Sequence, residues 1–210
     1  TREPVGTFTC ATTDEVDAAV AKARAAQPAW AALGPEGRAK YLRAALANLI
    51  DRMDDIIDVI CRESGKPATE ALMIDVFAAA DSLAYYAKNG ERFLRSDRRP
   101  LHGILKMTKK LEVNYQALGV VGVISPWNGP LILSLNPAVQ ALIAGNTVVV
   151  KPSEVTPYSG KMAVDLFAGT GLPDGVLQCV LGDGAVGAAL VNADLDKVHF
   201  TGSVATGRKI

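Results

Sequence analysis

The residues that decide the fold form two segments, Gly119-Val-Val-Gly-Val-Ile-Ser-Pro-Trp-Asn128 and Ala144-Gly-Asn-Thr-Val-Val-Val-Lys-Pro-Ser-Glu154. Each contains a short β-branched run, Val120 to Ile124 and Thr147 to Val150, without the polar alternation of a half-exposed strand. Such runs are typical of buried parallel strands. The apolar stretch between them, Leu131 to Ile143, is long enough for a crossover helix, so the sequence predicts a βαβ unit.

Each predicted strand ends in a polar segment that contains a proline. Ser125 to Asn128 follows the first strand, and Lys151 to Glu154 follows the second. Ligands bind at the carboxyl ends of the strands in open parallel sheets, so we expect the chemistry of the protein at these two tips.

Composition indicates a soluble globular protein of one large or two smaller domains. The 210 residues are 49% hydrophobic and 21% charged, with no net charge, which gives no electrostatic case for nucleic acid or an anionic membrane as a partner. No apolar run reaches the ~18 residues that a membrane helix needs. The three cysteines are few, odd in number and widely spaced, which favours a reducing, cytoplasmic compartment. His102 and His199 lie far from any cysteine pair, so no metal site is expected.

Helical patterns fill the amino-terminal part. Thr12 and Glu15 form a capping box that opens a helix running to Gln27, and a joint from Pro28 to Gly37 separates it from a second helix. A third helix ends at Gly65, which fits a left-handed cap. A fourth, long helix runs from about residue 67 to residue 90, and its aromatic side chains are expected to pack in the core: Phe77, Tyr85 and Tyr86.

The pattern then changes to an exposed connection and a hairpin. The run from Arg92 to Pro100 is basic and is interpreted as a solvated connection rather than a phosphate site. Residues 101–118 alternate in polarity and predict a hairpin that turns near Thr108 to Lys110. An isolated hairpin is marginally stable, so it should lean on another sheet or on a second subunit.

Further helices and strands alternate to the end of the chain. Helices are expected at about 157–168 and 185–192, strands at 176–181 and 198–200, and another helix from Thr201-Gly202-Ser203. The predicted fold is therefore α/β: a Rossmann-like parallel sheet with helices on both faces, preceded by a helical segment and carrying a protruding hairpin. We interpret both ends of the chain as truncated.

Gly182-Asp-Gly-Ala-Val-Gly187 matches the dinucleotide fingerprint G-x-G-x-x-G after a strand and at the start of a helix. The acidic residues that should follow it, Asp194 and Asp196, come about 10 residues later instead of about 20. A tight turn that needs glycine for close packing explains the motif equally well.

Lys151 and Glu154 suggest a ribose site, because an ammonium donates and a carboxylate accepts the hydrogen bonds of the two sugar hydroxyls. The Glu154 charge would repel a 2′-phosphate, which favours NAD over NADP. Asn128 is either a helix N-cap or an amide donor that faces a developing oxyanion. Ser203 is either a plain N-cap or part of a phosphate site at a helix start.

Together these segments resemble the aldehyde dehydrogenase superfamily. The matching stretches are residues 122–128, 144–154, 171–177 and 196–203, in order and at family-like intervals. Gly129 departs from the pattern, since many members carry a bulky residue there beside the substrate tunnel, and Thr206 departs slightly.

The resemblance implies a role for each tip. Lys151 and Glu154 would bind the adenine ribose, Ser203 with Gly202 the pyrophosphate, and Asn128 would donate to a thiohemiacetal oxyanion. The Gly182 turn would pack near the adenine. The residues expected to bind NAD, or NADP, are Ile124, Ser125, Pro126, Trp127, Lys151, Ser153, Glu154, Gly184, Gly187, Phe200, Thr201, Gly202, Ser203 and Thr206.

The resemblance also implies the reaction and the domains. In this family a cysteine thiolate attacks an aldehyde, hydride passes to NAD(P), and a glutamate-activated water hydrolyses the thioester. None of Cys10, Cys61 and Cys179 sits in a matching motif, so the nucleophile and the glutamate are expected after residue 210. The expected domains are an amino-terminal helical part of the cofactor-binding domain (1–100), an oligomerisation hairpin (101–118) and a Rossmann-like NAD(P)-binding domain (119–210).

Expected partners are an aldehyde and further copies of the chain, in a homodimer or homotetramer. Two other readings remain open. In the first, the chain would be a nucleotide-binding or assembly module without turnover. In the second, it would belong to an acylating or acyl-phosphate-reducing member of the same superfamily.

Overall fold

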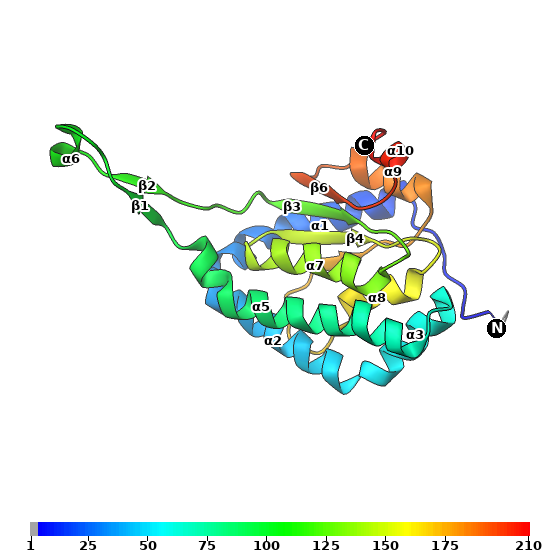
Figure 1. The fold of residues 1–210 in the computed structure, drawn as a ribbon. Helices are drawn as coiled ribbons and strands as arrows, with labels where there is room; N and C mark the ends of the chain where they lie inside the picture. The colour runs from blue at the N-terminus through cyan, green and yellow to red at the C-terminus, as the bar shows by residue number, and fades with distance from the viewer. Residues whose placement is uncertain (1–3) are drawn as a thin grey trace.

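The structure, a computed structural model, describes residues 4–210 and shows a parallel sheet between layers of helices, with a long hairpin projecting from one end (Figure 1). The elements up to the hairpin are α1 (Thr13–Ala32), α2 (Gly34–Asp51), α3 (Met53–Ser64), α4 (Ala68–Glu70), η1 (Ala71–Val76), α5 (Phe77–Leu94), β1 (Asp97–Arg99), α6 (Leu105–Thr108) and β2 (Leu111–Val113). The elements of the sheet and its connections are β3 (Val120–Ile124), α7 (Pro130–Ile143), β4 (Thr147–Lys151), α8 (Pro157–Asp165), β5 (Leu177–Cys179), α9 (Gly184–Asn192), β6 (Lys197–Phe200) and α10 (Val204–Gly207).

The sheet confirms the predicted α/β fold class. Its four parallel strands lie in the order β5-β4-β3-β6. The chain moves outward from β3 through β4 to β5 and then returns across the sheet in α9 to place β6 on the other side of β3. Strand order therefore reverses between β3 and β6, and in doubly wound sheets such a reversal opens a crevice beyond the carboxyl ends of the strands.

Each face of the sheet has its own apolar core, because the side chains of the two central strands, β3 and β4, are buried on both faces except for the half-buried Ile124. On one face Val121, Val123, Val148 and Val150 pack with buried residues of α7 and α8 and, beyond them, of α2, α3 and α5. On the other face Val120 and Val149 pack against α1 and α9. The amino-terminal helices thus share both cores with the sheet.

The first two helices correct the expected joint between them. The capping box at Thr12 and Glu15 is present, but α1 runs past Pro28 to Ala32, and α2 starts at Gly34. Proline inside a helix removes one backbone hydrogen bond. Here tertiary contacts hold the helix on both sides of it: the Gln27 amide donates to the Gly145 carbonyl at 3.1 Å, and Trp30 Nε1 donates to the Leu142 carbonyl at 3.0 Å.

The long helical segment differs from the expected single helix. It contains a π-helical stretch, Ala71–Val76, and continues to Leu94. Gly65 does close α3 in the left-handed conformation, with φ of 73°. The expected core role of the aromatic residues is wrong for two of the three, because Phe77 is 61% exposed and Tyr85 is 46% exposed, while Tyr86 packs against the core. Phe77 and Tyr85 lie on the outward face of α5.

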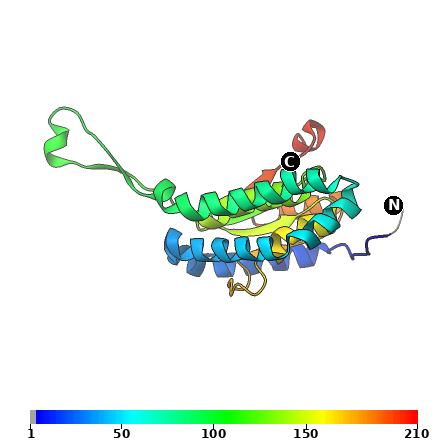
Figure 2. The ribbon, with the colours of Figure 1, turned by 60° about the horizontal axis from the view of Figure 1, so that its bottom comes forward.

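The hairpin lies earlier in the sequence than expected. Its antiparallel strands are Asp97–Arg99 and Leu111–Val113, and the helical turn α6 occupies its tip. The first strand is therefore part of the basic run that was interpreted as a connection. Figures 1 and 2 show the hairpin clear of the helices in both views. Several of its apolar side chains are exposed, including Ile104 and Met107, each at 78%.

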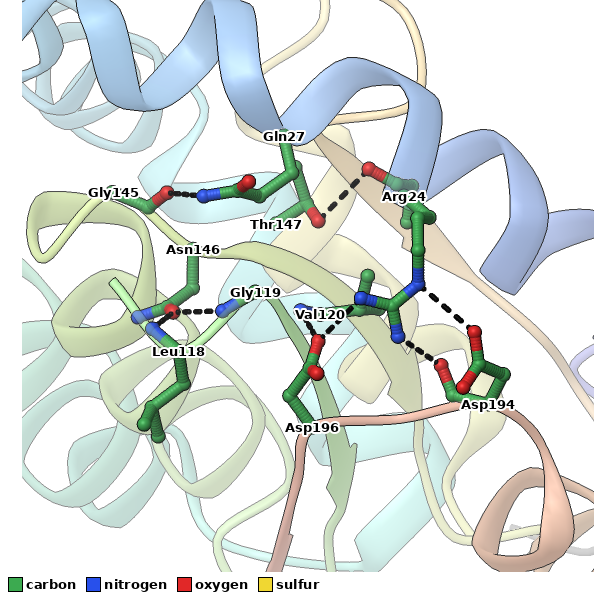
Figure 3. Close-up of polar contacts among 11 residues, drawn as sticks. Arg24, Gln27, Leu118, Gly119, Val120, Gly145, Asn146, Thr147, Asp194 and Asp196 are labelled. Carbon is green, nitrogen blue, oxygen red and sulfur yellow. Dashed lines mark hydrogen bonds and ion pairs between the residues drawn. The ribbon is translucent and has the colours of Figure 1, made fainter. Parts of the chain in front are cut away.

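A polar network fastens α1 to the starting edge of the sheet (Figure 3). Arg24 Nη1 lies 2.7 Å from the Asp196 carboxylate, which also accepts from the Val120 backbone N–H at 2.7 Å. Thr147 Oγ1 donates to the Ala23 carbonyl at 3.0 Å. The Asn146 side-chain oxygen accepts from the backbone N–H groups of residues 118 and 119 at 2.7 and 2.9 Å. The network joins α1 to β3, β4 and the segment that leads into β6.

No helix in the part of the chain that the structure describes has both the length and the apolar character needed to cross a bilayer.

Asp196 makes the stability of this fold decrease at acidic pH. Its bond from the Val120 N–H and its pairing with Arg24 lower the pKa of the carboxyl group. A carboxylate with a lowered folded-state pKa contributes stability above its unfolded pKa of about 3.9, and the contribution is lost as pH falls through the folded value. We expect Asp196→Asn to lower the free energy of unfolding by about 1 kcal/mol at pH 7 and to flatten its acid dependence.

Urea unfolding of the wild type and of Asp196→Asn, followed from pH 7 down to pH 3, measures this difference. Asp81→Asn is the matched control, because Asp81 is exposed on α5. Equal acid sensitivity of Asp196→Asn and the wild type would contradict the assignment.

Candidate functional site

A cleft of about 650 Å³ lies at the carboxyl ends of β3, β4 and β6, with α9 as one wall. It sits at the reversal of strand order, where a doubly wound sheet places its ligands. All fourteen residues predicted from the sequence for cofactor binding line this cleft. They come from the tips of three strands, from α9, from the segment between β6 and α10, and from α10 itself.

Strand register explains why segments distant in sequence meet here. Ile124, the last residue of β3, lies opposite Lys151 of β4 on one side and Phe200 of β6 on the other. The pairing continues one step further, since the Ser125 N–H donates to the Lys151 carbonyl and the Thr201 N–H donates to the Ile124 carbonyl. Because the three parallel strands end at the same level, the loops that follow them lie at the same edge of the sheet.

Lys151 and Glu154 form an ion pair at one side of the cleft. Their Nζ and Oε2 atoms are 3.3 Å apart, with the lysine side chain 5% exposed and the glutamate side chain 49% exposed. No other side-chain partner of the Lys151 ammonium is found among residues 4–210, and an ammonium has three N–H donors. The pair therefore keeps donor and acceptor capacity for two adjacent hydroxyls.

The glycines of the fingerprint fall into two groups. A Cβ at Gly182 would overlap Val186 at the start of α9, so this glycine permits close strand-to-helix packing. A Cβ at Gly184 would meet nothing within 4 Å, and one at Gly187 would meet only Lys151 Cδ at 3.9 Å. Because the last two glycines have no side chains, the space beside this part of α9 stays open to the cleft. The close-packing interpretation holds for Gly182, and the space beside Gly184 and Gly187 suits a ligand.

Ser203 caps the four-residue helix α10. Its Oγ accepts from the Thr206 N–H at 3.1 Å and lies 3.0 Å from Thr206 Oγ1. The N-cap interpretation therefore describes its side chain in this structure. Ser203 and Thr206 still line the cleft.

The β3 tip carries two polar side chains with different surroundings. Ser125 is buried, and its Oγ lies 2.6 Å from Ser134 Oγ of α7. Asn128 is exposed and does not line the cleft, although Trp127 beside it does. The N-cap of α7 is Gly129 and has no side-chain cap bond, so the N-cap alternative for Asn128 is wrong.

Sequence reasoning missed five residues that line the cleft: Ala188, Val191, Asn192, Lys209 and Ile210. The first three follow Gly184 and Gly187 at the three- and four-residue spacing of one helix face. That spacing was a usable signal, because a helix that presents two residues to a cleft presents its i+4 neighbours as well.

The cysteines do not form a nucleophilic site in the described part of the chain. Burial raises the pKa of the Cys179 thiol to about 12, so it stays protonated at neutral pH. Cys10 is exposed, and Cys61 is half-buried in α3. Among residues 4–210 no three His, Cys, Asp or Glu side chains gather as a metal site.

Comparison with known proteins places this geometry in a family. The model of the aldehyde dehydrogenase family matches residues 1–210. A 4,4′-diapolycopene aldehyde oxidase of Methylomonas sp. is 41% identical over 189 residues, which are 90% of this chain and 36% of that protein.

Solved structures agree with this placement. An aldehyde dehydrogenase from Brucella melitensis biovar abortus 2308 superposes with a TM-score of 0.91 at 33% identity, covering 98% of this chain and 42% of that one. An NADP-dependent enzyme of E. coli gives 0.90 at 36% identity, with 98% and 42% covered. The chain thus spans 36–42% of the length of these relatives. The family match over all 210 residues, together with the cleft at the strand ends, shows that the chain belongs to the aldehyde dehydrogenase family.

Proposed function

We propose that the protein that contains this chain oxidises an aldehyde to a carboxylic acid with NAD(P), and that this chain supplies the cofactor site and the oxyanion donor Asn128. The observation that carries the proposal is the convergence of all fourteen predicted cofactor residues on one cleft at the strand ends. Family membership supports the same reaction class. The nucleophilic cysteine and the glutamate that activates water are assigned to residues outside these 210.

The residues of the cleft fit a nicotinamide dinucleotide. Lys151 and Glu154 would hold the adenine ribose, and Gly184 and Gly187 leave space on the α9 side where a larger residue would project. Gly202 and Ser203 would lie along the pyrophosphate. The cofactor, when bound, accepts hydride from the substrate. The residues of this chain bind and orient it.

Asn128 would act on the substrate. Its side chain is exposed and has no hydrogen-bond partner among residues 4–210, so its NH₂ group is free to donate. A donor directed at the oxygen that becomes negative when a thiolate attacks a carbonyl stabilises the transition state more than the ground state.

The hairpin would join copies of the chain into a homodimer or homotetramer. It projects from the body, and its exposed apolar residues include Ile104, Leu105, Met107, Leu111 and Tyr115. Exposed apolar side chains gathered on one projecting segment mark an association surface. A cytoplasmic location is proposed because the cysteines are few and unpaired.

Asn128→Ala in the full-length protein is expected to lower kcat about 100- to 1,000-fold and to leave the Kd for NAD within about 3-fold. Steady-state kinetics with an aldehyde panel and calorimetric NAD binding test this. Asn89→Ala is the control, since the Asn89 amide donates only to the Tyr85 carbonyl on α5. A kcat for Asn128→Ala equal to that of the control would remove the oxyanion role.

Glu154→Ala is expected to weaken discrimination against NADP. Removing the carboxylate removes its repulsion of a 2′-phosphate, which should shift the NAD to NADP ratio of kcat/KM roughly 10-fold toward NADP. Glu91→Ala, on the exposed side of α5, is the control. An unchanged ratio would rule out the ribose role of this carboxylate.

The 210-residue chain alone is expected to show no aldehyde-dependent reduction of NAD. Cys179 is held protonated by burial, and no cysteine of the chain lines the cleft. Absorbance at the NADH band during incubation with NAD and an aldehyde measures the rate. Turnover above the protein-free background would show that one of these cysteines serves as the nucleophile after all.

A further inference from the structure

The helices that follow the two site loops begin in the same way. Both α7 and α8 carry proline at their first position, Pro130 and Pro157, and neither has a side-chain bond from its own N-cap residue. The first backbone N–H groups of a helix have no partner within it, so they need one from elsewhere. A proline first residue has no N–H and removes one of these requirements.

A buried carboxylate far away in sequence caps α7. Asp75 Oδ1 accepts from the backbone N–H groups of Leu131 and Ile132 at 3.2 and 3.3 Å, and the next N–H, that of Leu133, donates to the Gly129 carbonyl. With these bonds every N–H of the first turn of α7 has a partner.

A second carboxylate caps α8 by the same pattern. Glu63 Oε1 accepts from the Tyr158 N–H at 2.9 Å, and its Oε2 accepts from the Ser159 N–H at 2.6 Å. The following N–H, of Gly160, donates to the Thr156 carbonyl. Glu63 and Asp75 are therefore equivalent in function, one for each helix.

Asp75 is fixed more firmly than a surface cap would be. Its side chain is 0% exposed, and its second oxygen, Oδ2, lies 2.8 Å from Lys66 Nζ, a side chain that is itself 11% exposed. Asp75 lies in the π-helical stretch between α4 and α5, where an added residue per turn changes the direction of a side chain. Its two oxygens thus face two different partners, a helix start and an ammonium.

We propose that Asp75 and Glu63 are separate positioning residues for the two halves of the site. Asp75 sets the start of α7 and with it the loop that carries Asn128, two residues before Pro130. Glu63 sets the start of α8 and with it the loop that carries Ser153 and Glu154. This inference rests on the proposed function. It adds that the oxyanion donor and the ribose clamp are each held by one carboxylate from the amino-terminal helices.

The two roles separate kinetically in the full-length protein. We expect Asp75→Ala to lower kcat about 10-fold or more while the KM for NAD stays within about 3-fold, because only the loop of Asn128 loosens. Glu63→Ala should raise the KM for NAD about 10-fold and leave kcat at saturating NAD within about 3-fold. Asp75→Asn and Glu63→Gln keep an acceptor oxygen, so each should recover part of the loss.

Hydrogen exchange gives a readout that needs no activity. In Asp75→Ala the amides of residues 131–132 should exchange about 2- to 30-fold faster, as expected for a lost helix cap, with those of residues 158–159 unchanged. Glu63→Ala should give the reverse pattern. Where an alanine variant fails to fold, as judged by circular dichroism, the Asn or Gln variant carries the same comparison.

The outcomes distinguish this inference from the proposed function. Unchanged kinetics in Asn128→Ala and Glu154→Ala would remove the proposed function, while the exchange patterns would still test the two caps. Parallel changes of kcat, KM and exchange in the Asp75 and Glu63 variants would mean that both carboxylates stabilise the fold as a whole, and would overturn the proposal of separate positioning.

Discussion

The in-line ending of three parallel strands is the constraint on which the rest of the structure depends. Ile124 pairs with Lys151 on one side and with Phe200 on the other, so three loops leave the sheet at one level. A shift of one residue in either pairing would turn the β4 or β6 side chains to the opposite face, where the packing has formed around other residues, and would move the following loop away from the common edge. The two apolar cores that cover the sheet therefore fix the strand register, and with it both the fold and the position of the loops that form the cleft.

The central βαβ unit could be predicted from the sequence because it depends on local patterns, and the candidate cofactor residues meet in one cleft because they follow its strands and β6. Uninterrupted β-branched runs, the prolines at the tips and the glycine after α3 each have a single structural reading, and all were found. The helix-breaking effect expected of Pro28 was wrong, because tertiary contacts stabilise α1 on both sides of it, including those of Gln27 and Trp30 with residues more than 100 positions away. The first hairpin strand, Asp97–Arg99, was hidden by its charge, since a strand in solvent needs no apolar side.

The capping carboxylates could not have been found from one sequence. Asp75 and Glu63 contact helix starts 56 and 95 positions further along the chain, and nothing in their neighbours distinguishes them from surface acids. Thr156 before Pro157 is itself a suitable N-cap residue type, and only the structure shows that neither N-cap side chain bonds to the helix start. Asn128 was ambiguous for a related reason: asparagine suits both a helix start and an oxyanion donor, and the observed N-cap at Gly129 removes the first of these alternatives.

The ion pair between Arg24 and Asp196 spans 172 positions, and it has a consequence for how the chain matures on the ribosome. The surfaces that Val16, Val20 and Ala23 of α1 cover, on β3, β4 and α9, are synthesised long after α1 itself. At about 5–20 residues per second, the apolar side of α1 waits roughly 10 to 30 s for the partner that fastens it. During that interval Val16, Val20 and Ala23 are exposed to other chains, so this face of α1 is a surface that a nascent-chain chaperone would have to shield.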